Sequence, residues 1–182
     1  MKNQEWYLTE AGVFDWIKNT LKNTKNWIAK SGIKPGYFFL YNYDSKLYEE
    51  GKLPFFDAKP MILCLSATPT HVLGINVHYI PIRERKRIVA KLKSLYPEQW
   101  GTNKRLPNIS WGMVSHELQH AQYMLKLYLR DRIDEVVKIK PQDMENVLNV
   151  DLSDFVGIDA TKVWREYRNG TAIYDRTGKP GK

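Results

Sequence analysis

Cysteine is almost absent from this sequence of 182 residues, since Cys64 is the only one. One cysteine excludes an internal disulfide and a zinc site built from several thiolates. A reducing compartment or an assembly without disulfides is therefore expected. Cys64 lies in the apolar run 61–65, where the pattern predicts a small buried hydrophobic side chain.

Long apolar runs are also lacking. No stretch approaches the roughly 20 apolar residues that a membrane-spanning helix needs. Residues 1–12 contain neither the apolar core nor the small-residue cleavage site of a secretory signal. The sequence therefore predicts a soluble protein that is not secreted and has no membrane partner.

Acidic residues are scarce relative to basic ones. The chain has 20 Asp and Glu against 28 Lys and Arg, which gives a formal net charge of +8. Such a balance favours contact with nucleic acid or another acidic surface, the alternative being a basic surface that is only solvated. Hydrophobic residues at 43% and aromatic residues at 13% exclude a disordered chain and are enough for one packed domain.

Hydrophobic spacing divides the chain into three parts. Residues 9–30 have the period of an amphipathic helix, within an N-terminal segment 1–32. Residues 33–168 alternate between strand-like and helical patterns and are predicted to form one α+β domain. Residues 169–182 have little to bury and are predicted to be a flexible tail.

Four segments of the domain are predicted to be strands: residues 37–43, 61–67, 72–80 and 136–139. The second and third should pair as a hairpin, and the last should return to the early sheet. In residues 72–80, alternation places Leu73, Ile75, Val77 and Tyr79 on the buried face and His78 on the less apolar face. This layout predicts a small antiparallel SH3-like β-barrel decorated by helices.

Helical periodicity predicts the remaining elements. A basic helix should follow Pro81, with Ile88, Val89, Leu92 and Leu95 on its apolar side. A long helix is predicted over residues 111–134, after a loop at 97–108. Shorter helices are expected from Pro141, around 151–156 and over 161–168.

One motif suggests enzyme chemistry. His116-Glu117-Leu118-Gln119-His120 matches H-E-x-x-H on a predicted helix, the arrangement that holds zinc in metallopeptidases. A catalytic zinc needs a third protein ligand, and no histidine follows His120. We therefore predict no metal, no cofactor and no catalytic residue, and a small zinc metallopeptidase is the alternative.

The basic helix is the stronger candidate for function. Its apolar side is committed to a core, so its cations should face water or a polyanion. No nucleic-acid recognition motif is present, so any DNA contact should be to the backbone. The residues predicted to contact DNA or an acidic partner are Arg83, Arg85, Lys86, Arg87, Lys91, Lys104 and Arg105.

Three blocks of the sequence resemble a family of small virion proteins from contractile-tailed bacteriophages of the large myovirus type. The first combines Pro35-Gly36 and an aromatic strand with a leucine-proline-aromatic-aromatic-aspartate run at 53–57. The second and most specific is residues 73–81, followed by the basic helix. The third is residues 123–146 with Val163-Trp164. The resemblance covers residues 33–168.

Proteins of this family are labelled DNA end protectors or virion structural proteins. The resemblance implies a non-enzymatic component of the virion, assembled in the host cytoplasm and placed at a DNA end, the head–neck region or the tail baseplate. Its expected partners are other virion proteins and packaged double-stranded DNA. A sequence-independent nucleic-acid-binding module is a further alternative. H-E-x-x-H is not a feature of the family.

We expect His116 and His120 to hold no metal and Glu117 to have no catalytic role, because the third ligand is missing. Metal analysis of protein purified without chelators should find no stoichiometric zinc. Stoichiometric zinc that survives dialysis, together with peptidase activity that Glu117→Ala abolishes, would contradict this prediction.

Overall fold

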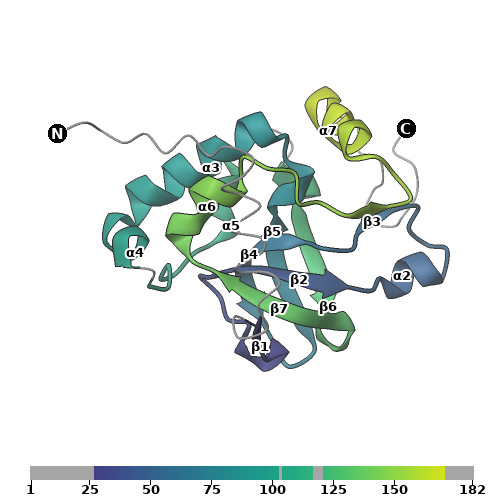
Figure 1. Cartoon of the computed structure of the whole chain (residues 1–182), viewed down its shortest axis with the longest axis horizontal. Coiled ribbons are helices and arrows are strands. Elements are labelled where there is room, and N and C mark those ends of the chain that lie inside the picture. The colour runs from purple at the N-terminus through teal and green to yellow at the C-terminus, as the bar shows by residue number, and fades with distance from the viewer. Residues whose placement is uncertain (1–26, 103, 117–120, 171–182) are drawn as a thin grey trace.

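The computed structural model of the chain describes residues 27–102, 104–116 and 121–170. Its centre is an antiparallel six-stranded sheet with the strand order β1-β7-β2-β4-β5-β6 (Figure 1). The strands of this sheet are β1 (Trp27–Ile28), β2 (Phe38–Tyr43), β4 (Met61–Ala67), β5 (His71–Asn76), β6 (Leu125–Leu129) and β7 (Ile133–Ile139). A second antiparallel pair joins β3 (Phe56–Asp57) and β8 (Phe155–Val156).

Four helices, α3 to α6, lie together over one side of the six-stranded sheet (Figure 1). The α-helices are α2 (Lys46–Glu49), α3 (Ile82–Leu95), α4 (Pro97–Thr102), α5 (Trp111–Ser115), α6 (Pro141–Val147) and α7 (Ala160–Asn169). Short 3-10 segments are η3 (Lys30–Gly32), η4 (Val77–Tyr79), η5 (Ala121–Tyr123) and η6 (Arg130–Arg132).

The two faces of β2 contribute to two separate hydrophobic clusters. Phe38 and Leu40 pack with α3 to α6, whereas Phe39 and Tyr41 pack on the opposite face with Cys64 and other buried residues. Because both faces are covered, this strand is apolar at every position from 38 to 41. The predicted burial of Cys64 is confirmed.

The sheet is strongly curled. The rings of Tyr41 on β2 and Tyr128 on β6 are only 5.5 Å apart between centroids, although β4 and β5 lie between their strands. Within the described residues β1 and β6 remain at the two edges, so the sheet does not close. A mixed fold with an antiparallel sheet is confirmed, but an SH3-like barrel is not.

Several predicted elements are confirmed. They are the strands at β2 and β4, the β4–β5 hairpin, the return of β7 to β2, and the helices α3, α6 and α7. The strand predicted over 72–80 ends earlier, at Asn76, and continues as η4. In this segment Ile75, Val77 and Tyr79 are buried as predicted, but Leu73 is only half-buried.

The long helix predicted over residues 111–134 is wrong. α5 ends at Ser115, and the chain forms β6 from Leu125 to Leu129 and then enters β7 at Ile133. Helical and strand periods both fit residues 125–129, and pairing of β6 with β5 decides in favour of the strand. Leu95, predicted on the apolar side of the basic helix, is exposed.

Three local predictions also need correction. The segment 151–156 contains β8 and no helix, and the loop predicted over 97–108 begins with α4. Of the helix predicted over 9–30, residues 9–26 lie outside the described residues. Trp27–Ile28 form strand β1, and η3 begins at Lys30. Residues 171–182 of the predicted tail also lie outside the described residues.

Gly36 provides a sharp test of the packing between β2 and the segment after α4. Its φ is +84°, and a Cβ at this position would lie 2.2 Å from the carbonyl oxygen of Leu106. Gly36→Ala should therefore lower the free energy of unfolding by about 3 kcal/mol or more. Gly51→Ala is the matched control, since Gly51 has φ +67° but no atom within 4 Å.

Urea unfolding of both variants measures the difference. The control should lose only the cost of a left-handed backbone, about 1 kcal/mol. Equal losses in the two variants would show that backbone conformation, and not the contact with Leu106, decides the requirement for glycine.

Candidate functional site

Helix α3 carries the basic residues that the sequence predicts as a contact surface. Arg85, Ile88, Val89 and Leu92 repeat at intervals of three and four residues, and all are buried. The opposite side of the helix is exposed, and it presents Arg83, Lys86 and Arg87 to solvent. We call these three residues the α3 basic face.

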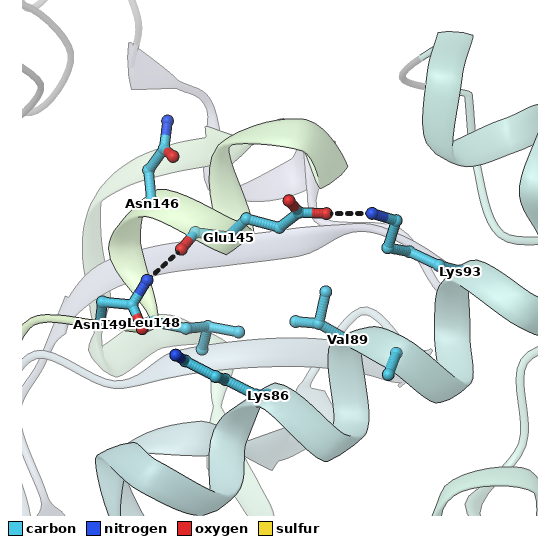
Figure 2. Close-up of a pocket in the computed structure, with 8 residues that line it drawn as sticks. Lys86, Val89, Lys93, Glu145, Asn146, Leu148 and Asn149 are labelled. Carbon is cyan, nitrogen blue, oxygen red and sulfur yellow. Dashed lines mark hydrogen bonds and ion pairs between the residues drawn. The ribbon is translucent and has the colours of Figure 1, made fainter. Parts of the chain in front are cut away.

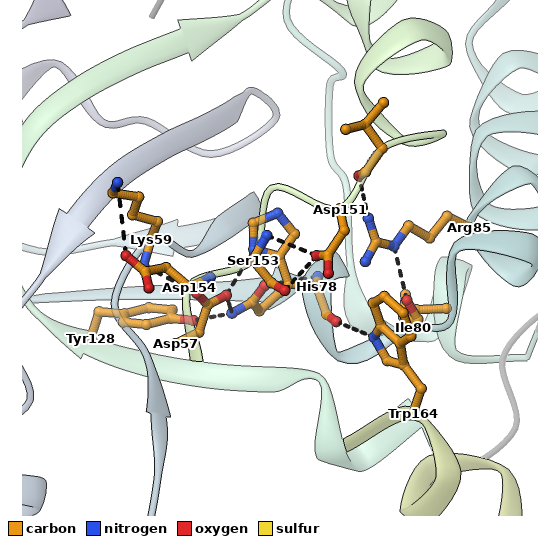
Figure 3. A network of polar contacts seen from close by, with 12 residues as sticks. Asp57, Lys59, His78, Ile80, Arg85, Tyr128, Asp151, Ser153, Asp154 and Trp164 are labelled. Carbon is orange, nitrogen blue, oxygen red and sulfur yellow. Dashed lines mark hydrogen bonds and ion pairs between the residues drawn. The ribbon is translucent and has the colours of Figure 1, made fainter. Parts of the chain in front are cut away.

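Arg85 is the exception among the predicted contact residues, because it is fully buried. Its Nε donates to the carbonyl oxygen of Ile80 at 2.8 Å, and Nη1 donates to that of Val150 at 3.3 Å (Figure 3). Its guanidinium carbon lies 5.6 Å from the ring centroid of Trp164. Arg85 therefore anchors α3 to the segment around Val150 and to α7.

Burial lowers the pKa of Arg85 to about 10, against the opposing effect of Asp151 and Asp57. At neutral pH the buried side chain therefore remains a cation. The prediction that Arg85 faces DNA or a partner surface is wrong. In a helix with many cations, a cation is still buried when its position lies on the same side of the helix as the core residues, as Arg85 does.

The other predicted contact residues lie in two places. Lys91 is half-buried on α3. Lys104 and Arg105 are exposed, but they follow α4, beyond the C-terminal end of α3. A helix of 14 residues is about 20 Å long, so these two cations are well separated from Arg83 along α3.

Helix α7 adds exposed cations that the sequence prediction did not include: Lys162, Arg165 and Arg168. α7 contacts the N-terminal half of α3, where burial and a hydrogen bond with Glu84 raise the pKa of Tyr167. Arg165 lies 4.0 Å from Glu166, whereas the α3 basic face makes no ion pair with a described residue. The sequence did carry a signal for these exposed cations. Val163 and Tyr167 are four residues apart and mark the buried side of α7, so the cations between and beside them face outward.

A buried polar network lies behind this surface, centred on the carboxylate of Asp57. Oδ2 of Asp57 accepts hydrogen bonds from His78 Nδ1 at 2.8 Å and from Asn76 Nδ2 at 3.0 Å (Figure 3). Oδ1 accepts from the backbone N–H groups of Lys59 at 3.1 Å and Asp154 at 3.3 Å. Asn76 also donates to the hydroxyl of Tyr128.

Burial by itself raises the pKa of Asp57, but the charge of His78 and the hydrogen bonds outweigh it and hold this pKa below its usual value. The carboxyl is therefore ionised, and Nδ1 of His78 must carry the proton that it donates. His78, predicted on the less apolar face, is fully buried. An Asp–His pair can act as a catalytic base only when a substrate reaches it, and burial prevents that here.

The H-E-x-x-H motif is only partly within the described residues. His116 is exposed directly after α5, and residues 117–120 lie outside them. Among the described residues no cluster of three or more His, Cys, Asp or Glu could hold a metal. None of the described helices has the length and apolar character to cross a membrane.

Comparison with known proteins identifies the family. The family model of the phage T4 terminal DNA protecting protein matches residues 4–167. The chain belongs to this family. No curated protein and no solved structure gives a match.

Membership of the terminal DNA protecting family confirms the resemblance to phage DNA end protectors seen in the sequence. The match begins at residue 4, well before residue 33, so it includes most of the N-terminal segment, and it ends at residue 167. This is not a known enzyme family, which agrees with the burial of the Asp57–His78 pair.

The two kinds of cation on α3 should respond differently to alanine. Arg85→Ala removes the donor from a buried carbonyl at Ile80 and a half-buried one at Val150 and creates a cavity, so the free energy of unfolding should fall by about 3 kcal/mol or more. Arg83→Ala removes an exposed side chain and should change stability by less than about 0.5 kcal/mol. Urea unfolding distinguishes them, and a small effect of Arg85→Ala would contradict the anchoring role.

Proposed function

We propose that this protein is a non-enzymatic structural component of a phage virion that binds the ends of packaged DNA through backbone contacts. The observation that carries the proposal is the α3 basic face, three exposed cations on one side of one helix with no ion pair to a described residue. The family description, a terminal DNA protecting protein, supplies the ligand.

The geometry supports contact with phosphates and not with bases. α3 is fixed by four buried residues, and the helix lies along the domain and does not project from it (Figure 1). Its exposed cations therefore lie on the surface of the domain. Flexible lysine and arginine side chains on such a surface follow a backbone without reading sequence. Lys162 and Arg168 on α7 extend the surface. Lys104 and Arg105 contribute to a second contact beyond α4.

The remaining surface is assigned to other virion proteins. Leu127 on the edge strand β6 is 61% exposed, and Leu47 on α2 is 47% exposed. An edge strand with exposed apolar side chains pairs readily with another chain. We therefore place protein partners at the β6 edge and DNA at α3 and α7.

Salt dependence tests the DNA contact. The logarithm of the binding constant should fall linearly with the logarithm of salt concentration, with a slope of about −0.9 per phosphate neutralised. Replacing Arg83, Lys86 and Arg87 together with alanine should reduce the magnitude of that slope by roughly two to three units. Arg85 is kept, because its replacement would test stability and not contact.

A second triple variant with the same change in net charge serves as the control. Lys46, Lys52 and Lys59 are exposed but each pairs with a carboxylate, Glu50 or Asp154. Their replacement with alanine should leave the slope nearly unchanged. Equal effects of the two triple variants would show that net charge alone, and not the α3 basic face, determines DNA affinity.

A further inference from the structure

A cleft of about 390 Å³ lies between α3 and α6, beside the α3 basic face (Figure 2). Val89 and Leu148, both buried, and the exposed Ala90 form an apolar floor. Its volume lies within the range of about 300–1,000 Å³ that small-ligand sites occupy. A DNA duplex is too wide to enter a cleft of this size, whereas a single nucleotide is small enough.

The two ends of the cleft differ in charge. Lys93 on α3 and Glu145 on α6 form an ion pair that bridges the two helices at one end (Figure 2). Lys86 lies about two turns away along α3, toward the other end, and makes no ion pair with a described residue. The cleft therefore carries one uncompensated positive charge, and its carboxylate is already neutralised.

The α6 side of the cleft offers amide groups. Nδ2 of Asn149 donates to the carbonyl oxygen of Glu145 at 2.7 Å, which leaves its Oδ1 as an acceptor. Asn146 also lines the cleft. An apolar floor with amides at its side and one cation at its mouth matches a nucleotide, in which a flat base is joined to a phosphate.

We infer that the cleft between α3 and α6 holds the terminal nucleotide of a DNA strand, with its phosphate on Lys86 and its base on the floor of Val89, Ala90 and Leu148. This inference rests on the proposed binding of DNA ends. The Lys93–Glu145 bridge prevents a strand from running through, and because Lys93 is already paired, this end of the cleft offers no free cation to a phosphate. A nucleotide therefore enters base first, which only the end of a strand allows at low unstacking cost.

The test compares two duplexes of one sequence, one with open ends and one with both ends closed by hairpin loops. The complete chain should bind the open duplex about tenfold more tightly than the closed one. Ala90→Phe fills the cleft and should bring this ratio to about one. Ser94→Phe places the same side chain on an exposed position of α3 that does not line the cleft, and it should keep the wild-type ratio.

A 2-aminopurine base at the open end reports the predicted geometry. Its fluorescence should rise when the wild-type protein unstacks it, and should not rise with Ala90→Phe. Lys86→Gln is a second variant, with Arg83→Gln as its partner of equal charge. Both variants should reduce the magnitude of the salt-dependence slope by about one unit. Only Lys86→Gln should also reduce the ratio of affinities for the open and closed duplexes.

The possible failures are distinguishable. Salt-dependent binding with equal affinity for both duplexes overturns the cleft assignment and leaves the α3 basic face in place. A ratio that survives Ala90→Phe in a folded protein also overturns it. If the Ala90→Phe variant does not fold, the pair Lys86→Gln and Arg83→Gln decides. The same ratio of open-duplex to closed-duplex affinity in both variants would then overturn the cleft assignment. Absence of binding to either duplex at low salt overturns the proposed function itself.

Discussion

The buried carboxylate of Asp57 is the interaction on which the arrangement of the basic surface depends. An isolated buried charge costs several kcal/mol, and here four donors from three segments of the chain offset that cost. Through Asn76 the network reaches Tyr128 on β6. Through His78, whose carbonyl oxygen accepts from Nε1 of Trp164 at 2.8 Å, it reaches α7. Trp164 in turn lies against Arg85 on α3. The same chain of contacts therefore links α3 and α7, the two helices of the proposed DNA-binding surface.

Arg85 shows why a basic helix can be held firmly against an apolar core. Its aliphatic stem lies on the same side of the helix as Ile88, Val89 and Leu92. Its guanidinium donates to the backbone carbonyls of Ile80 and Val150, two residues that are far apart in the sequence. The neighbouring Lys86 and Arg87 project from the other side of the same turn. A rigid helix fixes where those cations lie, and this rigidity would reduce the entropy lost in the proposed binding of phosphates.

Local patterns predicted several elements: β2 and β4 from β-rich runs, α3 from Pro81 and an apolar stripe, α6 from Pro141, and α7 as a helical segment over 161–168. They failed at 125–129, where Leu125 and Tyr128 have helical spacing, Leu125, Leu127 and Leu129 alternate as in a strand, and pairing with β5 decided. The burial of Arg85 had a signal, its spacing of three, four and seven residues from Ile88, Val89 and Leu92. The burial of His78 had none, because its partner Asp57 is 21 residues away and only the folded chain brings them together. The cleft is likewise invisible in sequence, since Lys93 and Glu145 are 52 residues apart.

Charge alone does not distinguish the end of a duplex from its interior, because phosphates are equally spaced in both and counterion release is the same for each contact. At physiological ionic strength the Debye length is about 8 Å, so the α3 basic face acts only on phosphates close to it. In the proposed role the protein protects an end by occupying it, and preference for the end needs a contact that the interior lacks. An unstacked terminal base offers such a contact, and its burial on an apolar floor depends little on salt because it involves no ion pairs. In the proposed function Lys86 joins two roles, because it belongs to the α3 basic face and also lies at the mouth of the cleft: the cations would hold the backbone, and the cleft would provide the preference for ends.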